Sequence, residues 1–231
     1  MSYYKYVEPR WARALVEEGR LMFSSLAWFQ ESEDPSRGDE FEGVRKYFPA
    51  DGLAITRLSE PAGSFVDADH SFQSAARERD HIFIFSVSRT LSPELQAKFA
   101  GPEPKEMACV EIHDIGLFYD RLARALGKRS PVQRRTLFHD DVTYYRFEEP
   151  PLGVWPLPAR LTTHKESRHS DEEEHRFIFS TKRNAFALEH VEIVLVHRDA
   201  RTPRRTLDPM HHRRPLALGP LDDCCQIVAC S

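Results

Sequence analysis

The residues best suited to chemistry lie between Ser170 and Ser180, where an acidic run leads directly into a strand pattern. In one-letter code the segment reads SDEEEHRFIFS. A rigid strand can hold a carboxylate in fixed geometry against a substrate, which a loop does less well. Glu172 and Glu174 are therefore candidate catalytic residues.

Side chains alternate along an extended segment, which predicts that Glu172 and Glu174 share one face. We assign Glu173, His175 and Arg176 to the other face. Two such carboxylates could divide the work of glycosidic cleavage, one orienting a sugar hydroxyl and the other stabilising positive charge at the anomeric carbon. The alternative is a solvated strand edge whose charges discourage aggregation.

Serines close two of the predicted strands. Ser24 follows an apolar run near the N-terminus, and Ser86 and Ser88 end another. Polar groups at strand ends often contact ligands. On spacing alone, local capping of the next turn is the better explanation.

No metal site is predicted. His164 and His169 are five residues apart, and His211 and His212 are adjacent, so neither pair has the spacing of zinc ligands. The sequence has no Cys-x-x-Cys pair and no glycine-rich phosphate loop. Reduced structural thiols are the expected state of the cysteines, which are Cys109, Cys224, Cys225 and Cys230.

The net charge of −4 gives no global signal of nucleic-acid binding. Residues 31–42 are acidic, whereas residues 198–214 are rich in arginine. The arginine-rich segment is either a phosphate-binding surface or a solvated loop.

The length of 231 residues and the ordinary apolar fraction of 41% predict one domain over residues 1–231. We place its core at 3–197 and a C-terminal extension at 198–231. No apolar run approaches the length of a membrane span, and the N-terminus lacks the layout of a secretory signal. A cytoplasmic protein without a membrane partner is expected.

Hydrophobic patterning predicts an α+β fold, a single mixed and mostly antiparallel sheet with a few short helices. A helix begins near Pro9 and ends at Gly19, and another begins at Ser92. A third follows the cap Asp114, carries an apolar stripe and ends at Gly127; the stripe consists of Ile115, Phe118, Leu122 and Leu126. We expect residues 175–180 and 185–197 to pair as a hairpin, and residues 44–80 to hold little beyond a strand at 53–58. The predicted strands are 3–7, 20–25, 53–58, 81–88, 107–113, 142–147, 175–180, 185–197 and 225–229.

Several motifs, taken in order, resemble a bacterial family catalogued as a domain of unknown function. They are a tyrosine-rich first strand (residues 4–6), Gly19, the LMFSS strand at 21–25, the GDEFE loop at 38–42, Phe85-Ser86, and the EEEHR strand at 172–176. The resemblance covers most of residues 3–197. It departs from the family pattern at Gly38-Asp39-Glu40 and at His175.

More distantly, this order of motifs is similar to ADP-ribosyltransferase-like folds, which implies a split sheet. That resemblance implies Glu174 as the catalytic acid with Glu172 as its helper. It also implies that NAD, as substrate, contacts residues of the first strands and of the apolar strand. Those residues are Tyr4, Lys5, Tyr6, Ser24, Ser86 and Ser88.

The leading hypothesis is thus an NAD-consuming transferase or glycohydrolase, plausibly a bacterial toxin, effector or phage-defence component with an antitoxin or other regulatory partner. The acceptor could be protein, nucleic acid or water. One alternative is a non-catalytic nucleic-acid-binding module that uses residues 198–214. Another is a metal-dependent nuclease built on Asp34, Asp39, Glu42 and histidines.

Overall fold

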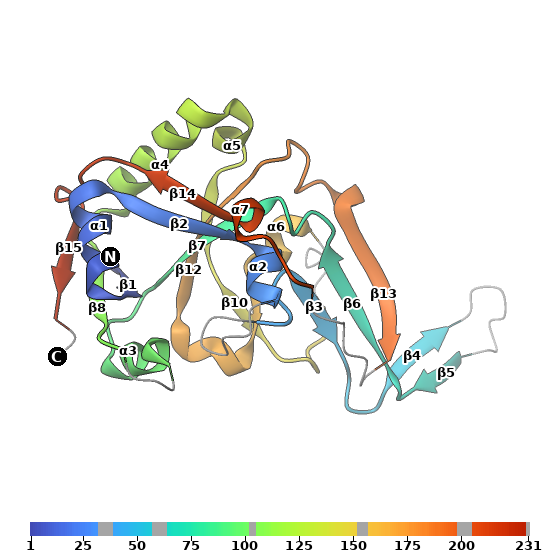
Figure 1. Ribbon diagram of the computed structural model, residues 1–231. Coiled ribbons are helices and arrows are strands. Elements are labelled where there is room, and N and C mark those ends of the chain that lie inside the picture. Colours follow the sequence, from blue (N-terminus) through green and yellow to red (C-terminus); the bar gives the residue numbers. More distant parts are fainter. Residues whose placement is uncertain (32–38, 57–63, 102–104, 152–156, 198–204, 230–231) are drawn as a thin grey trace.

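The computed structural model describes residues 1–31, 39–56, 64–101, 105–151, 157–197 and 205–229. They form a mixed α+β arrangement of mostly antiparallel sheets with a few short helices (Figure 1). The strands are β1 (Tyr3–Val7), β2 (Arg20–Ser25), β3 (Val44–Tyr47), β4 (Leu53–Thr56), β5 (Ser64–Asp67), β6 (His70–Ala76), β7 (Ile82–Ser88), β8 (Ala108–Ile112), β9 (Phe138–Asp141), β10 (Thr143–Tyr145), β11 (His164–Glu166), β12 (Glu174–Ser180), β13 (Val191–His197), β14 (Arg213–Ala217) and β15 (Cys225–Val228). The helices are α1 (Pro9–Glu18), α2 (Leu26–Glu31), α3 (Pro93–Ala100), α4 (Ile115–Arg129), α5 (Pro131–Arg135), α6 (Pro158–Leu161) and α7 (Pro209–His212), with 3₁₀ segments η1 (Ser167–Glu172) and η2 (Leu188–His190).

Strand β7 is the centre of the main sheet, whose order is β14-β2-β7-β1-β8-β15. One edge of β7 pairs with β12 along the whole strand, and β9 continues the sheet beyond β12. The other edge is shared: Phe83 and Ile84 pair with β2, whereas Ser88 pairs with Tyr4 of β1. The sheet therefore divides along this edge. The apolar sequence of β7 explains its central place, because both of its faces are covered.

The two faces of the main sheet differ in chemistry. One face carries the large core, in which phenylalanines of β2, β7 and β12 pack against α1 and α4. The opposite face has two smaller apolar clusters, one around Ile84 and Ile178 and the other around Tyr6 and Leu95. On this same face, β7 and β12 also carry polar residues that pair across the two strands. They are Ser86, Ser88, Glu174 and Arg176. This polar stretch holds the candidate site.

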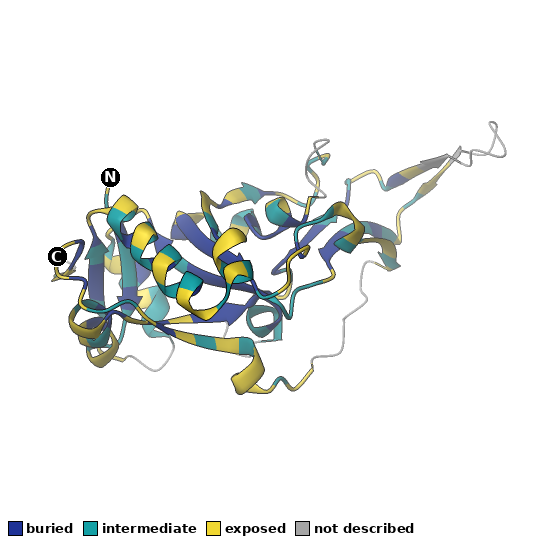
Figure 2. Ribbon diagram, turned by 90° about the horizontal axis from the view of Figure 1, so that it is seen from above, coloured by how far each residue is buried: buried dark blue, intermediate teal, exposed yellow. Residues whose placement is uncertain are grey.

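Helix α4 confirms its sequence pattern. Asp114 caps it by accepting the backbone N–H of Leu117 at 2.9 Å. Phe118, Leu122 and Leu126 are buried against the core, and the helix continues past Gly127 to Arg129. Seen from the side that α4 covers, its outward side is exposed and its inner side is buried (Figure 2).

The predicted hairpin between residues 175–180 and 185–197 is wrong. β12 is buried throughout and lies between β7 and β9, whereas β13 is mostly exposed and pairs with β6 in a separate sheet of order β13-β6-β3. The two strands are close in sequence, but the buried β12 lies inside the main sheet and the mostly exposed β13 lies at the edge of the separate sheet. The weak pattern of residues 44–80 predicted only β4, so β3, β5 and β6 were missed.

The C-terminal segment contributes strands to two edges of the main sheet. β14 pairs with β2, and β15 pairs with β8. The sequence predicted β15 but not β14. Cys109, Cys224 and Cys225 are buried, while Cys230 lies outside the described residues. In the part of the chain that the structure describes, no helix combines the length and apolar character needed to cross a bilayer.

Gly19 ends α1 in the left-handed conformation, with φ 63°, as its sequence position predicted. A Cβ at this position would lie 2.0 Å from the carbonyl oxygen of Gly219, so Gly19→Ala forces backbone apart. We expect this variant to lower the free energy of unfolding by about 3 kcal/mol, from left-handed strain and overpacking together. Urea denaturation measures it.

Gly219→Ala is the matched control, because Gly219 has a φ of 79° but a Cβ there would meet no atom within 4 Å. It should cost about 1 kcal/mol, the strain alone. Equal losses in the two variants would contradict the close approach of α1 to the C-terminal segment.

Candidate functional site

The acidic segment is not a continuous strand. Ser167–Glu172 is a 3₁₀ segment, Glu173 follows in the left-handed region with φ 40°, and β12 begins only at Glu174. Within the 3₁₀ turn, His169 Nδ1 lies 3.2 Å from Glu172 Oε1. Glu172 and Glu174 do come together, but a shared cation rather than strand alternation joins them.

Arg176 is the centre of the site. Only 1% of it is exposed, and all five of its N–H groups donate hydrogen bonds. Nε and Nη2 reach the two oxygens of Glu174 at 2.8 and 3.0 Å, and Nη1 and Nη2 reach those of Glu42 at 2.5 and 3.0 Å. The fifth bond goes from Nη1 to the carbonyl oxygen of Thr162 at 2.6 Å. Our assignment of Arg176 to the Glu173 face was wrong, because residues two apart on a strand share a face.

Lys165 of β11 joins the two predicted catalytic residues. Its Nζ lies 2.6 Å from Glu172 Oε2 and 3.1 Å from Glu174 Oε2. Lys98 of α3 approaches the other oxygen of Glu172 at 2.9 Å, from a more exposed position. Glu42, Glu172 and Glu174 thus share two buried cations, Arg176 and Lys165.

Because these two cations are shared unequally, the three carboxyl groups differ in pKa. Burial opposes ionisation of Glu174, but Arg176 and Lys165 outweigh it and hold the pKa below its usual range. Burial also opposes ionisation of Glu172, where His169 and Lys165 lower the pKa to about 2. Burial dominates at Glu42 and raises its pKa despite Arg176. Glu174 is therefore ionised at neutral pH, and Glu42 is the easiest of the three to protonate.

A pocket of about 270 Å³ opens beside Glu174. Tyr144 lies on its wall, and the Tyr144 hydroxyl accepts the backbone N–H of Glu174 at 2.8 Å. Burial raises the pKa of Tyr144, so its hydroxyl stays protonated and can donate to a ligand. Arg89 stands at the same pocket and pairs with Asp141 at 3.1 Å. The pocket is lined by Arg89, Asp141, Val142, Tyr144, Ser170, Glu173 and Glu174.

Three of the predicted cofactor-binding residues lie near Glu174. The side chain of Ser86 hydrogen-bonds Glu174 and helps to lower its pKa. Ser88 Oγ donates to the carbonyl oxygen of Glu172 at 2.7 Å. Tyr4 is directly opposite Ser88 in the register of β1 and β7, and Glu174 is opposite Ser88 on the other side.

None of the six predicted cofactor-binding residues lines the pocket, and the other three are engaged elsewhere. Tyr6 is buried against Phe99, with ring centroids 5.6 Å apart, and its hydroxyl donates to the carbonyl oxygen of Thr90. Lys5 points to the core face, where its Nζ lies 4.7 Å from the ring centre of Phe85. Ser24 pairs with Ile84, in the half of β7 away from Ser88. Side chains alternate along a strand, so Lys5 faces the core side while its neighbours Tyr4 and Tyr6 face the other way.

Sequence reasoning missed the basic members of the site. Arg176 and Glu42 both belong to motifs of the family resemblance, the late EEEHR strand and the GDEFE loop, and their contact joins those motifs in space. The presence of Glu42 and Arg176 in motifs of one family pattern was the sequence signal that could have placed both in the site. Lys165 lies outside every quoted motif, and nothing in the sequence pointed to it.

Several residues of the two alternative hypotheses contact other side chains of the protein. For the nuclease, Asp34 lies outside the described residues and Glu42 binds Arg176. Among the described residues no group of three or more acidic, histidine or cysteine side chains could hold a metal ion.

In the arginine-rich segment, residues 198–204 are not described, and the arginines that follow them contact other parts of the chain. Arg205 pairs with Glu31 and Asp80. The guanidinium group of Arg213 lies over Trp28, and that of Arg214 lies over Phe83.

Comparison of the chain with protein-family models, with curated proteins and with solved structures finds no match.

The depressed pKa of Glu172 predicts a pH-dependent stability. A carboxyl whose folded-state pKa is lowered from 4.5 to about 2 contributes stability above pH 4.5 and loses it as the pH falls toward 2. At neutral pH this contribution is about 3 kcal/mol. We expect Glu172→Gln to lower the free energy of unfolding by about that amount at pH 7, and the difference from wild type to shrink by pH 3. Urea denaturation across this range measures both.

Asp171→Asn serves as the control, since the Asp171 side chain is 55% exposed and its ion pair is with the partly exposed Lys98. Its cost should stay below about 1 kcal/mol at every pH. A pH-independent cost for Glu172→Gln would contradict the ionic role of Glu172.

Proposed function

We propose that this protein cleaves the bond between nicotinamide and ribose in NAD, as an ADP-ribosyltransferase-like transferase or glycohydrolase, with Glu174 as the essential carboxylate. The observation that carries the proposal is a buried, ionised glutamate at the wall of a pocket. Breaking this bond builds positive charge on the ribose, and a preorganised carboxylate in a water-poor site stabilises that charge far better than water does.

The cations around Glu174 support this role in two ways. They keep the carboxylate charged near neutral pH, which an electrostatic catalyst of this kind requires. They also fix its position, because Arg176 holds both carboxylate oxygens and Lys165 holds one of them. Catalytic groups must be held within fractions of an ångström of the productive geometry. Glu172, which shares Lys165 with Glu174, acts as a positioning residue.

The pocket walls offer groups suited to the reacting half of NAD. At about 270 Å³ the pocket is near the lower end for small-molecule sites, so it fits the nicotinamide riboside part while the rest of the dinucleotide extends along the surface. Tyr144 supplies an aromatic ring and a hydroxyl donor. Arg89 supplies a guanidinium at the rim, a group well matched to phosphate.

The divided main sheet adds support at the level of the fold. A split sheet is what the distant resemblance implies, and β7 shares one edge between β1 and β2. In this arrangement β1, β7 and β12 bring Tyr4, Ser88 and Glu174 into one row. Consumption of NAD is compatible with a toxin, effector or phage-defence role, and the acceptor is then water, protein or nucleic acid.

Glu174→Gln tests the catalytic role. It keeps the shape of the side chain and removes its charge, so we expect the rate of nicotinamide release from NAD to fall at least about 100-fold. The measurement is chromatography of purified protein incubated with NAD at pH 7. Thermal melting of the variant reports separately on folding.

Glu42→Gln is the matched control, because Glu42 binds the same guanidinium but does not line the pocket. It should lower the stability, because it weakens the Arg176–Glu42 pair, but the protein that remains folded should retain activity within about tenfold of wild type. Absence of nicotinamide release from the wild-type protein, or equal losses in the two variants, would refute the proposed role of Glu174.

Arg89→Gln tests the binding of the phosphates. Loss of a charged contact made equally in the ground and transition states raises KM and leaves kcat unchanged. We expect KM for NAD to rise about tenfold, which corresponds to about 1.4 kcal/mol. Steady-state kinetics would show this, with Lys105→Gln as the control because Lys105 is exposed and does not line the pocket. A fall in kcat at constant KM would contradict it.

A further inference from the structure

The segment from Arg121 to Arg135 is strongly basic in a protein whose net charge is −4. It comprises the second half of α4 and all of α5, and it contains no acidic residue. Its basic residues are Arg121, Arg124, Lys128, Arg129, Arg134 and Arg135. We call this set the α4–α5 basic surface.

Packing turns these side chains outward. The apolar stripe of α4 is buried in the core, which leaves the intervening positions to the solvent side. All members of the set except the half-buried Arg121 are exposed. α5 folds back against the end of α4, so that a Cβ at Gly127 would lie 3.0 Å from Cδ of Arg134.

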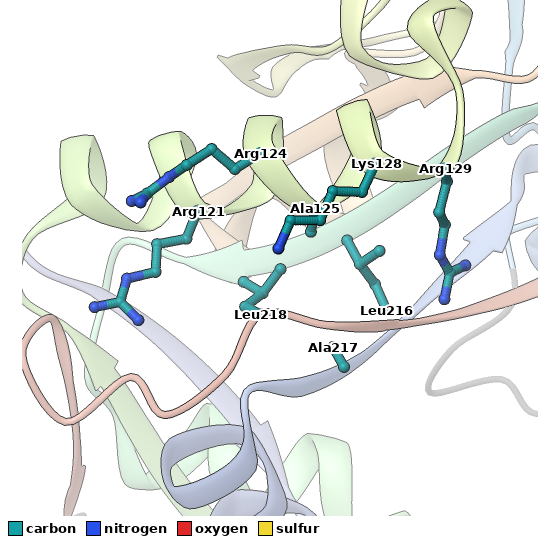
Figure 3. Close-up of a pocket in the computed structure, with 8 residues that line it drawn as sticks. All are labelled: Arg121, Arg124, Ala125, Lys128, Arg129, Leu216, Ala217 and Leu218. Atoms are coloured by element: carbon teal, nitrogen blue, oxygen red, sulfur yellow. The ribbon is translucent and has the colours of Figure 1, made fainter.

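Between α4 and the chain of β14 lies a pocket of about 310 Å³ (Figure 3). Its cationic wall consists of Arg121, Arg124, Lys128 and Arg129, and its apolar wall consists of Ala125 and residues 216–218. In Figure 3 the side chains of Arg121 and Arg129 extend from α4 toward the β14 side, and that of Arg124 runs along the helix.

Little of this positive charge is neutralised within the described part of the chain. Arg121 pairs with Asp223 and donates to the carbonyl oxygen of Pro220. Arg124 donates only to the backbone oxygen of Asp120. No carboxylate among the described residues forms an ion pair with Arg124 or with any of the four cations that follow it.

Helix dipoles account for part of the pattern, since cations are favourable in the last turn of a helix. Lys128 and Arg129 occupy the last turn of α4, and Arg134 and Arg135 that of α5. The dipole does not explain Arg124, which lies more than a turn earlier. It also does not offset the mutual repulsion of two cationic helix ends packed together, which an anionic ligand would relieve.

We propose that the α4–α5 basic surface binds the phosphodiester backbone of a nucleic acid. At a rise of 1.5 Å per residue, Arg121 and Lys128 lie roughly 10 Å apart along the helix, too far for one phosphate group to reach both backbone positions. A chain of phosphates matches a row of cations of this length. The pocket lining has no aromatic residue on which a base could stack, so binding is independent of sequence.

This surface is separate from the candidate active site. α4 packs on the core face of the main sheet, and the Glu174 carboxylate lies on the opposite face with Ser86 and Arg176. The proposal therefore does not rest on the proposed activity. It moves the predicted nucleic-acid contact from residues 198–214 to α4 and α5.

Fluorescence anisotropy with labelled 20-mers of single-stranded DNA, single-stranded RNA and duplex DNA tests the proposal. The wild-type protein should bind at 50 mM salt, with an affinity that falls steeply as salt rises. Arg124→Gln combined with Lys128→Gln should weaken binding at least tenfold. Since each lost phosphate contact lowers the salt slope by about 0.7 on a single strand and about 0.9 on a duplex, the slope should fall by about 1.4 or 1.8.

The matched control combines Lys105→Gln with Arg146→Gln, which removes the same charge from exposed positions outside the basic surface. It should bind like wild type, and both double variants should melt like wild type. The three oligonucleotides distinguish single strands from duplex as the preferred form. Absence of binding to all three, equal losses in the two double variants, or binding of pyrophosphate without nucleic acid would overturn the proposal.

Discussion

The interaction on which the site depends is the clamp of Arg176 between Glu174 and Glu42. It joins β12 to the turn before β3, and the bond from Arg176 to the Thr162 carbonyl adds the end of α6. Removing one partner from such a buried ion pair leaves an unpaired charge and costs about 3–5 kcal/mol. The face of the sheet that carries the site can therefore assemble only when all three segments are in place.

The same clamp sets the electrostatics of the pocket. Glu174 and Glu172 stay ionised because Arg176 and Lys165 compensate for their burial, and Glu42 is left as the most easily protonated carboxyl. On α4 and α5, across the sheet, Arg124 and the four cations that follow it form no ion pair with any carboxylate of the described residues. The main sheet thus separates a buried ion-pair site from a cationic outer surface. Two anionic ligands could occupy these places without competing.

Sequence predicted the elements whose pattern is set locally. The apolar run of β7, the stripe of α4 with its Asp114 cap, and Gly19 at the end of α1 were all predicted correctly. Pairing depended on distant partners, so the hairpin of β12 with β13 was wrong and β14 was missed. The candidate glutamates were found because an acidic run leads directly into a strand pattern. Lys165 could not be found, since only the folded chain brings it to them.

The cost of the buried charges argues for a role beyond stability. Replacing a buried ionic group by well-packed apolar residues is often neutral or stabilising, because desolvation offsets much of the attraction. Here five charged side chains lie inside a region flanked by two apolar clusters that show how the same face could be packed without them. The charges are instead arranged so that one carboxylate, with both oxygens held by Arg176, stands at a pocket beside a protonated tyrosine. Stability alone does not require that arrangement, whereas the role we propose for Glu174, stabilising positive charge on a bound ribose, does.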